Sequence, residues 1–281
     1  MIIFKEIDAL QSFLAGKDEI GFVPTMGALH TGHLTLLQES LKHSKLTICS
    51  IFVNPTQFND PRDFEKYPIT LEKDIELLTN AGVDAVFVPT VATIYPAGLN
   101  KLETYPLGSL EKLWEGSYRP GHFQGVCQVV SRLLDAVQPH KIYMGQKDFQ
   151  QCMVIKKLIE LKNISTELIQ VATVRETSGL AMSSRNMRLS ATEKTTAVTI
   201  SQVLDYLRDH INILPISLLL QEAQNRLMQA GFKVDYVGIA DASTLEPIVQ
   251  IDPKRDAVAM IAAYLNEVRL IDNKLIYTAL Q

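Results

Sequence analysis

The chain has 281 residues, of which 47% are hydrophobic and 21% are charged, so it is long enough for one large globular domain or two unequal ones and is neither disordered nor fibrous. Its formal net charge of -4 at pH 7 provides no basic surface for a nucleic-acid backbone, which argues against a nucleic-acid partner. The N-terminal segment lacks the pattern of a signal peptide and no apolar run reaches about 18 residues, so we expect a cytoplasmic protein without a membrane partner.

The first 172 residues alternate short apolar runs with amphipathic stretches. The runs predict strands at 20–24, 47–53, 83–89, 141–145 and 167–172. The stretches predict helices at 31–43, 70–81, 123–137 and 150–161. Alternation of this kind indicates a Rossmann-like parallel sheet with right-handed crossovers, so a ligand site is expected at the carboxyl ends of the strands.

The pattern changes after residue 172. Helices are predicted at 191–209 and 216–231, followed by strands at 233–240, 257–265 and 267–271, the last of which leads to a turn at Asp272 and Asn273. This order is typical of a small α+β domain. We therefore predict an α/β protein with a Rossmann-like catalytic domain at 1–175 and a smaller α+β domain at 176–281.

The cysteines Cys49, Cys127 and Cys152 are odd in number and far apart, and no C-x-x-C pair occurs. This spacing argues against both a disulfide framework and a zinc knuckle. Each cysteine lies among apolar neighbours, so we expect three buried free thiols.

A phosphate-binding segment is predicted at 22–33, although the chain has neither a P-loop nor a G-x-G-x-x-G fingerprint. The segment leaves the first predicted strand, turns at Gly27 and Gly32 and enters a helix whose start offers unpaired N–H groups. His30 and His33 stand three residues apart there and can both donate to one anion. Two alternatives remain open: a pair of surface histidines, or a two-histidine metal site, which lacks a nearby third ligand.

Two further segments follow strand ends. In 50–59, Asn54 and Gln57 suit the hydroxyls and carboxylate of a small polar substrate, although an Asn-Pro turn with a solvated glutamine is the alternative. In 143–151, Lys147 could neutralise phosphate and Asp148 could meet Mg²⁺, although a Lys-Asp pair is usually a surface ion pair.

Two polar segments complete the candidates. Ser183, Ser184 and Arg185, after a turn at 178–179, could wrap phosphate oxygens as a mobile clamp, and a serine-rich linker is the alternative reading. The segment 119–125, RPGHFQG, opens a helix and is expected to shape the cleft.

The motifs PTMGALHTGH, SIFVNPTQF, RPGHFQGV, GQKDFQQ, GLAMSSRN and RLIDN occur in this order over nearly the whole chain. Together they resemble the pantoate–β-alanine ligases, or pantothenate synthetases, a family of the nucleotidyltransferase group with the HIGH signature. H-x-G-H alone indicates only that broader group. SIFVNPTQF and MSSRN narrow the resemblance to this family.

The resemblance implies an ATP-dependent ligase of coenzyme A biosynthesis that works in two steps. Pantoate and ATP give pantoyl adenylate and pyrophosphate, and the amine of β-alanine then displaces AMP to give pantothenate. The resemblance also implies Mg²⁺ bound with the ATP phosphates, a homodimer, and a smaller C-terminal domain that closes over the site.

The resemblance assigns residues to these roles. His33 and His30 would be catalytic together with Lys147 and Arg185, while Gln57 and Gln151 would bind pantoate, with Gln57 also serving β-alanine. Asp148 would meet the metal. The ATP-binding residues would be Met26, Gly27, Ala28, Leu29, His30, Thr31, Gly32, His33, Gly145, Gln146, Lys147, Asp148, Val174, Met182, Ser183, Ser184 and Arg185.

Three positions depart from the family's pattern: Ile69 where a basic residue is common, Ser178 where an acid is common, and Asn266 where a glycine is common. None removes a catalytic group. Two other functions compete with the ligase. Another adenylyltransferase of the group would leave Gln57 and Gln151 without a role, and a regulatory nucleotide-binding module would not need the histidines or Lys147.

Overall fold

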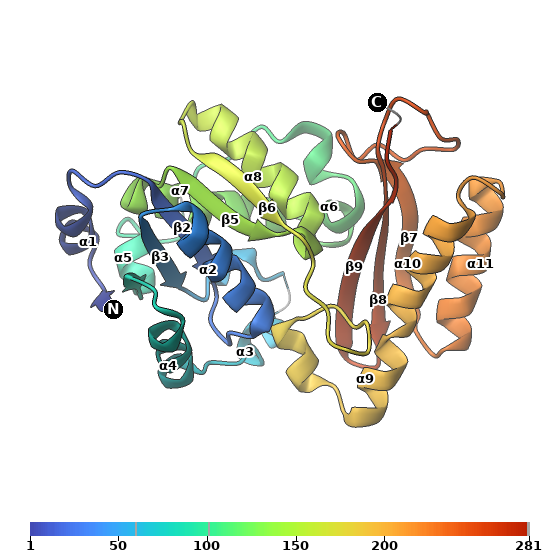
Figure 1. Cartoon of the computed structure of the whole chain (residues 1–281), viewed down its shortest axis with the longest axis horizontal. Coiled ribbons are helices and arrows are strands. Elements are labelled where there is room, and N and C mark those ends of the chain that lie inside the picture. Colours follow the sequence, from blue (N-terminus) through green and yellow to red (C-terminus); the bar gives the residue numbers. More distant parts are fainter. Residues whose placement is uncertain (60, 101, 280–281) are drawn as a thin grey trace. The chain divides into compact units, whose positions relative to one another are not determined.

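A computed structural model describes residues 1–59, 61–100 and 102–279 (Figure 1). The chain divides into two compact units, and neither is continuous in sequence. The first unit comprises Met1–Glu111, Arg119–Gln146 and Gln151–Ala172, and the second comprises Lys112–Tyr118, Lys147–Gln150 and Thr173–Gln281. Two short segments, Lys112–Tyr118 and Lys147–Gln150, therefore belong to the second unit although they are flanked in sequence by residues of the first.

A six-stranded sheet forms the centre of the first unit. Its strands are β1 (Ile2–Phe4), β2 (Ile20–Thr25), β3 (Leu46–Ile51), β4 (Ala85–Phe87), β5 (Lys141–Gly145) and β6 (Glu167–Val171). The strand order is β1-β4-β3-β2-β5-β6, and every neighbouring pair is parallel. The expected parallel-sheet α/β fold is confirmed.

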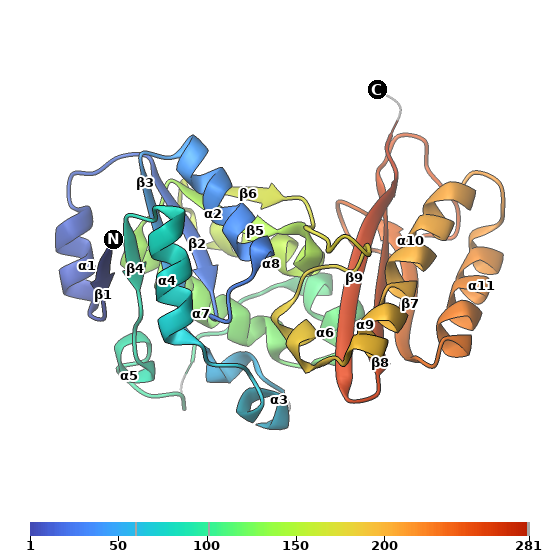
Figure 2. The same cartoon turned by 60° about the horizontal axis from the view of Figure 1, so that its bottom comes forward.

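Helices cover both faces of this sheet (Figures 1 and 2). Residues of α1 (Ile7–Leu14), α7 (His122–Val137) and α8 (Phe149–Lys162) share one buried cluster. Residues of α2 (Thr31–His43) and α4 (Leu71–Ala81) share another. Shorter elements are α3 (Pro61–Glu65), α5 (Val91–Ile94) and the 3-10 turns η1 (Pro55–Gln57), η2 (Gly108–Glu111) and η3 (Gln146–Asp148).

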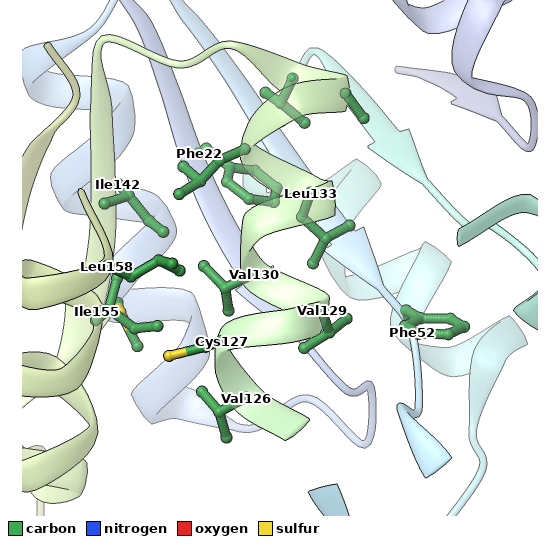
Figure 3. Close-up of a cluster of buried hydrophobic side chains, with 14 of the residues drawn as sticks. Phe22, Phe52, Val126, Cys127, Val129, Val130, Leu133, Ile142, Ile155 and Leu158 are labelled. Carbon is green, nitrogen blue, oxygen red and sulfur yellow. The ribbon is translucent and has the colours of Figure 1, made fainter. Parts of the chain in front are cut away.

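The strands separate the two clusters because successive side chains of a strand point to opposite faces. Phe22 of β2 and Ile142 of β5 lie against α7 and α8, as Figure 3 shows, whereas their neighbours Val23 and Tyr143 belong to the cluster of α2 and α4. Both faces are apolar, as a parallel sheet between two helical layers requires. The sheet thereby fixes where each strand ends, which positions the site.

The second unit has a three-stranded antiparallel sheet of β7 (Lys233–Asp241), β8 (Ala257–Leu265) and β9 (Val268–Tyr277), in that order. Helices α10 (Thr199–His210) and α11 (Ile216–Gln229) lie along this sheet (Figure 2). Apolar residues of these helices and of α9 (Ala191–Ala197) form one core with the sheet. The predicted small α+β fold of this region is confirmed. The 3-10 turn η4 (Ser184–Arg188) precedes α9.

The short helix α6 (Trp114–Tyr118) also belongs to the second unit. The Trp114 ring lies so close to the backbone of Gly238 in β7 that a Cβ there would collide with it. The indole N–H of Trp114 donates to the Leu245 carbonyl at 2.8 Å. Arg269 of β9 binds both carboxylate oxygens of Glu115 at 2.8 Å. These contacts explain why a seven-residue segment joins a sheet made of residues far along the chain.

Three sequence predictions need correction. Asp272 and Asn273 do not form a turn, because β9 continues through them to Tyr277, and the Asp272 carboxylate and the Asn273 side-chain N–H find partners inside the unit. The helix predicted at 191–209 is two helices that meet at Val198. The strand predicted at 83–89 is shorter, Ala85–Phe87.

The three cysteines are free and buried, as expected. Burial raises the pKa of the Cys49 and Cys127 thiols to about 12, so both remain protonated at neutral pH. Within the described ranges, no helix combines the length and the apolar composition needed to cross a membrane.

Candidate active site

Three of the predicted segments in the first unit leave the same edge of its sheet. Strand β2 lies between β3 and β5, and the parallel strands bring the residues after Thr25, Ile51 and Gly145 to one edge. The chain continues from β2 to β3 and β4 on one side, and then to β5 and β6 on the other. This reversal is the topological switch point at which open α/β sheets bind ligands.

The turn after β2 is held by a buried carboxylate. Gly27 and Ala28 both have positive φ, 80° and 48°, and the second value is unusual for a residue with a side chain. Asp74 of α4 accepts the Ala28 N–H at 2.9 Å and the Leu29 N–H at 2.8 Å, and the Thr70 hydroxyl donates to it at 3.2 Å. Asp74 thus fixes the conformation of the segment that leads to the histidines.

Sequence reasoning missed Asp74, although a signal was available. The residue stands between Leu71 and Leu78 at helical spacing, on the apolar stripe of α4. A carboxylate inside such a stripe is only 1% exposed here. A buried acid requires donors, so its position could have suggested a loop held by its backbone.

One expectation about this segment is wrong: the backbone N–H groups around the helix start are largely used by the protein itself. Besides the two bonds to the buried aspartate, Gly27 donates to Thr25 Oγ1 at 3.2 Å, His30 to His33 Nδ1 at 3.3 Å and Gly32 to His30 Nδ1 at 3.1 Å. Side chains, rather than these amides, are therefore the groups that can receive an anion here.

His30 and His33 form a reciprocal cap at the start of α2. Their ring centroids are 4.1 Å apart. Because the Nδ1 atom of each ring accepts a backbone N–H, the proton of each neutral imidazole is on Nε2. The structure therefore brings two imidazole rings, each with an Nε2–H donor, together at the switch point.

Gln57 lies beside the histidine segment. Its amide nitrogen is 3.0 Å from Met26 Sδ, and its amide oxygen accepts from Asn54 Nδ2 at 3.2 Å. Asn54 is itself almost fully buried, donates to the Gly125 carbonyl at 3.1 Å and accepts the Tyr95 hydroxyl at 2.8 Å. Burial raises the pKa of Tyr95, which keeps this hydroxyl protonated as a donor.

The segment 119–125 supports the backbone of Gln57. His122 Nδ1 donates to the Gln57 carbonyl at 2.8 Å, and its Nε2 is 3.0 Å from Arg119 Nη1. A Cβ at Gly125 would collide with the Thr56 carbonyl, so η1 lies directly against α7. This contact was not apparent from the sequence.

The remaining candidates in the first unit are Gly145 at the end of β5, Gln146 in η3 and Gln151 in α8. Gln151 is partly buried. Apart from its own atoms and those of its two chain neighbours, no atom of the described residues lies within 4 Å of a Cβ built on Gly145. This glycine is therefore not required by packing within the protein.

The other candidates lie in the second unit. Lys147 Nζ is 3.7 Å from Asp148 Oδ1, and their side chains are 17% and 47% exposed.

A hairpin and the turn after it hold the last candidates. The Met182 N–H donates to the Val174 carbonyl at 2.9 Å, so these two residues face each other across the hairpin. Ser183 then caps η4, where its hydroxyl accepts the Arg185 N–H at 3.2 Å. Ser184, the next residue along the chain, is buried.

The three departures from the family's pattern have simple local settings. Ile69 is 81% exposed, and Ser178 accepts the Leu180 N–H at 3.4 Å. Asn266 has a φ of 51° between β8 and β9 and donates to Glu193 at 2.5 Å. Asparagine tolerates this left-handed conformation better than other residues with side chains, which explains how it can replace a glycine.

A family model described as Pantoate-beta-alanine ligase matches residues 2–275. The chain belongs to the pantoate-beta-alanine ligase family. It is 43% identical to the pantothenate synthetase of Cytophaga hutchinsonii over 98% of this chain and 99% of that one. It is 44% identical to the pantothenate synthetase of Azobacteroides pseudotrichonymphae over 97% of this chain and 99% of that one.

Solved members of the family have the same fold. The pantothenate synthetase of Thermus thermophilus is 38% identical to this chain. The match covers 99% of this chain and 100% of the Thermus chain, with a TM-score of 0.93. The pantoate-beta-alanine ligase of Francisella tularensis, solved with beta-gamma ATP and beta-alanine, is 37% identical over 99% of both chains with a TM-score of 0.84. The expected family, fold and ligase activity are thus confirmed. The assignments of individual site residues stay predictions.

Proposed function

We propose that the chain condenses pantoate with β-alanine in two steps at the expense of ATP, through a pantoyl-adenylate intermediate. The observation that carries the proposal is the pair of Nε2–H donors of His30 and His33 at the switch point of the first unit. It is supported by membership of a family in which one solved relative holds an ATP compound and beta-alanine.

In the first step, a carboxylate oxygen of pantoate attacks the α-phosphorus of ATP and pyrophosphate leaves. Negative charge grows on the phosphate oxygens and the leaving group, so the reaction needs fixed donors and cations more than a covalent nucleophile. His33 and His30 would donate through Nε2, and Lys147 and Arg185 would supply positive charge.

In the second step, the uncharged amine of β-alanine attacks the acyl carbon and AMP leaves, while the amine loses a proton. Gln57 and Gln151 would bind pantoate, because amides match hydroxyls and a carboxylate without adding charge. The contacts of Gln57 with Met26 and Asn54 support this role, since they hold its side chain beside the histidine segment.

The proposed ATP-binding residues are Met26–His33, Gly145, Gln146, Lys147, Asp148, Val174 and Met182–Arg185. Among the described residues, no group of three or more His, Cys, Asp and Glu could hold a metal ion. A half-exposed carboxylate such as Asp148 fits Mg²⁺ that takes most of its ligands from phosphates and water. The ion would neutralise phosphate charge.

The remaining expectations are part of the same proposal. Residues 1–175 would bind ATP and pantoate, and residues 176–281 would close over the bound substrates and contribute to a homodimer in the cytoplasm. Light scattering of the purified protein tests the dimer, which would have twice the mass of the 31.4 kDa chain.

The proposed reaction is tested by AMP release from ATP with pantoate and β-alanine each omitted in turn. We expect sustained AMP release, with pantothenate formed in equal amount, only when both are present. AMP transfer to a phosphorylated acceptor without pantoate would instead identify another adenylyltransferase. ATP binding without any turnover would identify a regulatory module.

A further inference from the structure

The RLIDN segment was singled out in the sequence, but the proposed reaction gives it no role. We propose that Asp272 and Asn273 of this segment are positioning residues for the nucleotide. They would fix the Val174–Met182 hairpin and Lys147 in one arrangement within the second unit. The inference rests on the proposed function, because it concerns residues assigned to ATP binding.

Asp272 holds the hairpin through Arg175, the residue after Val174. The Arg175 guanidinium donates to both carboxylate oxygens of Asp272, at 2.6 and 3.0 Å. The same guanidinium donates to the Gly179 carbonyl at 3.2 Å. Arg175 therefore ties the tip of the hairpin to β9 by a two-pronged charged contact, which fixes direction as well as distance.

The turn of the hairpin lies between the two ends that would bind ATP. Gly179 has a φ of 96°, and its N–H donates to the Glu176 carbonyl at 2.8 Å, which closes the turn. The Met182 N–H then bonds to the Val174 carbonyl. Loss of the contact with Asp272 would therefore free the hairpin whose two ends, Val174 and Met182, would bind ATP.

Asn273 holds the other segment. Its side-chain amide donates to the Lys147 carbonyl at 2.8 Å. Neighbouring residues of a strand point to opposite faces of the sheet, so two consecutive residues of β9 reach two segments that are far apart in sequence. The segments reached are those that hold the proposed nucleotide-binding residues Lys147 and Val174.

Burial makes a purely space-filling role a poor explanation. Asp272 and Asn273 are 5% and 4% exposed, and apolar residues would fill these positions at a lower desolvation cost. Buried charged pairs are not a general source of stability, whereas they can specify one arrangement of the groups they join. The expected consequence is therefore a defect in ATP recognition.

The test compares Asp272→Asn and Asn273→Ala with the control Asp241→Asn. Asp241 is also a buried aspartate of the second unit that is paired with an arginine, Arg255 at 3.0 Å, and no nucleotide role is assigned to it. Steady-state kinetics gives KM for ATP and for pantoate, and calorimetry gives Tm. We expect KM for ATP to rise roughly tenfold or more in the two test variants, with KM for pantoate within about twofold. The control should lower Tm and leave both KM values unchanged.

A double-mutant cycle of Arg175→Gln with Asp272→Asn supplies a second readout. If the pair acts as one unit, the double variant should raise KM for ATP no more than the worse single variant. Arg175→Gln and Asn273→Ala also test the two contacts if Asp272→Asn does not fold. Unchanged KM for ATP, or equal losses for ATP and pantoate, would overturn the inference. An unmodified enzyme that releases no AMP would overturn the proposed function instead.

Discussion

At the scale of single residues, Asp74 is the least expected part of the site. It makes no proposed contact with substrate, yet it holds two backbone amides in a turn with two consecutive positive φ values. Such a turn is unfavourable for Ala28 without external support. The geometry of His30 and His33 therefore depends on a carboxylate from another helix.

We expect Asp74→Asn to destabilise the protein by about 1–3 kcal/mol and to lower kcat, because an amide nitrogen would face one of the two N–H donors. Denaturant unfolding and steady-state turnover measure the two effects. Glu72→Gln is the matched control, since it removes an exposed carboxylate from the same helix. Equal stability and turnover in Asp74→Asn would show that the turn does not need the charge.

His33 combines two roles that one substitution can separate. Its Nδ1 accepts the His30 N–H at 3.3 Å, and its Nε2 is the proposed donor. The side-chain oxygen of asparagine can occupy the place of Nδ1, but asparagine has no counterpart of Nε2. We expect His33→Asn to keep Tm close to that of the unmodified protein and to lower kcat by about 10²–10³.

The control for this variant is His33→Ala, which removes both roles and should lower Tm as well as kcat. Melting curves and single-turnover rates distinguish the two variants. A His33→Asn enzyme with nearly normal kcat would exclude Nε2 from the chemistry, while an equally low Tm in both variants would show that asparagine does not restore the cap.

At the scale of elements, two glycines at strand and helix ends lead to opposite expectations. A Cβ on Gly145, at the end of β5, has open space, whereas a Cβ on Gly125, in α7, would collide with the Thr56 carbonyl. If nucleotide lies against Gly145, Gly145→Ala should raise KM for ATP roughly tenfold without loss of stability. Gly125→Ala should instead lower Tm and raise KM for pantoate, because it displaces Gln57.

Calorimetry together with titration of each substrate tests this pair. The two variants serve as controls for each other, since both add one methyl group close to the proposed site. A Gly145→Ala enzyme with unchanged KM for ATP would remove this glycine from the nucleotide site. Lower Tm in that variant would indicate a packing role that the geometry does not show.

The sequence predicted most of the elements because their periodicities are strong. Strands β2, β3 and β5 and helices α2 and α7 carry repeated apolar residues over several turns or pleats. Strand β1 and helices α3, α5 and α6 were missed, since segments of three to five residues are too short for a period to show. The eight-residue helix α1 was missed as well.

The polar pair Asp272 and Asn273 is a case in which the local sequence misleads. Aspartate and asparagine are typical turn residues, so the local sequence alone predicts a turn at these positions. Their buried partners, which are distant in sequence, decide otherwise.

At the scale of the whole molecule, the two units are not two halves of the sequence. Lys112–Tyr118 and Lys147–Gln150 join the second unit, and side-chain contacts explain why. Gln150 accepts the Glu115 N–H at 3.0 Å and donates to the Leu113 carbonyl at 2.9 Å. These contacts join residues 35 or more positions apart, which no local pattern reveals. The candidate residues were therefore found by motif, but their distribution over the units was not.

Formation of the adenylate is the step that tests the proposed reaction of the whole molecule. If the adenylate forms before β-alanine reacts, the first step is reversible by itself. Labelled pyrophosphate should then exchange into ATP when pantoate is present and β-alanine is absent. The intermediate must be kept from water during this time, because an acyl adenylate hydrolyses readily. We therefore expect pantoate-dependent exchange with little net release of AMP.

Three other outcomes of the exchange experiment have distinct meanings. Exchange that requires β-alanine would favour a concerted reaction, since no intermediate would form without the amine. Exchange without pantoate would indicate that AMP becomes attached to the enzyme. This outcome would contradict the proposed reaction, in which Lys147 and the histidines do not act as nucleophiles. Rapid AMP release with pantoate alone would show that the adenylate forms but is not shielded. The His33→Asn enzyme is the internal control, because loss of the Nε2 donor should slow the exchange by the same factor as kcat if adenylate formation limits turnover.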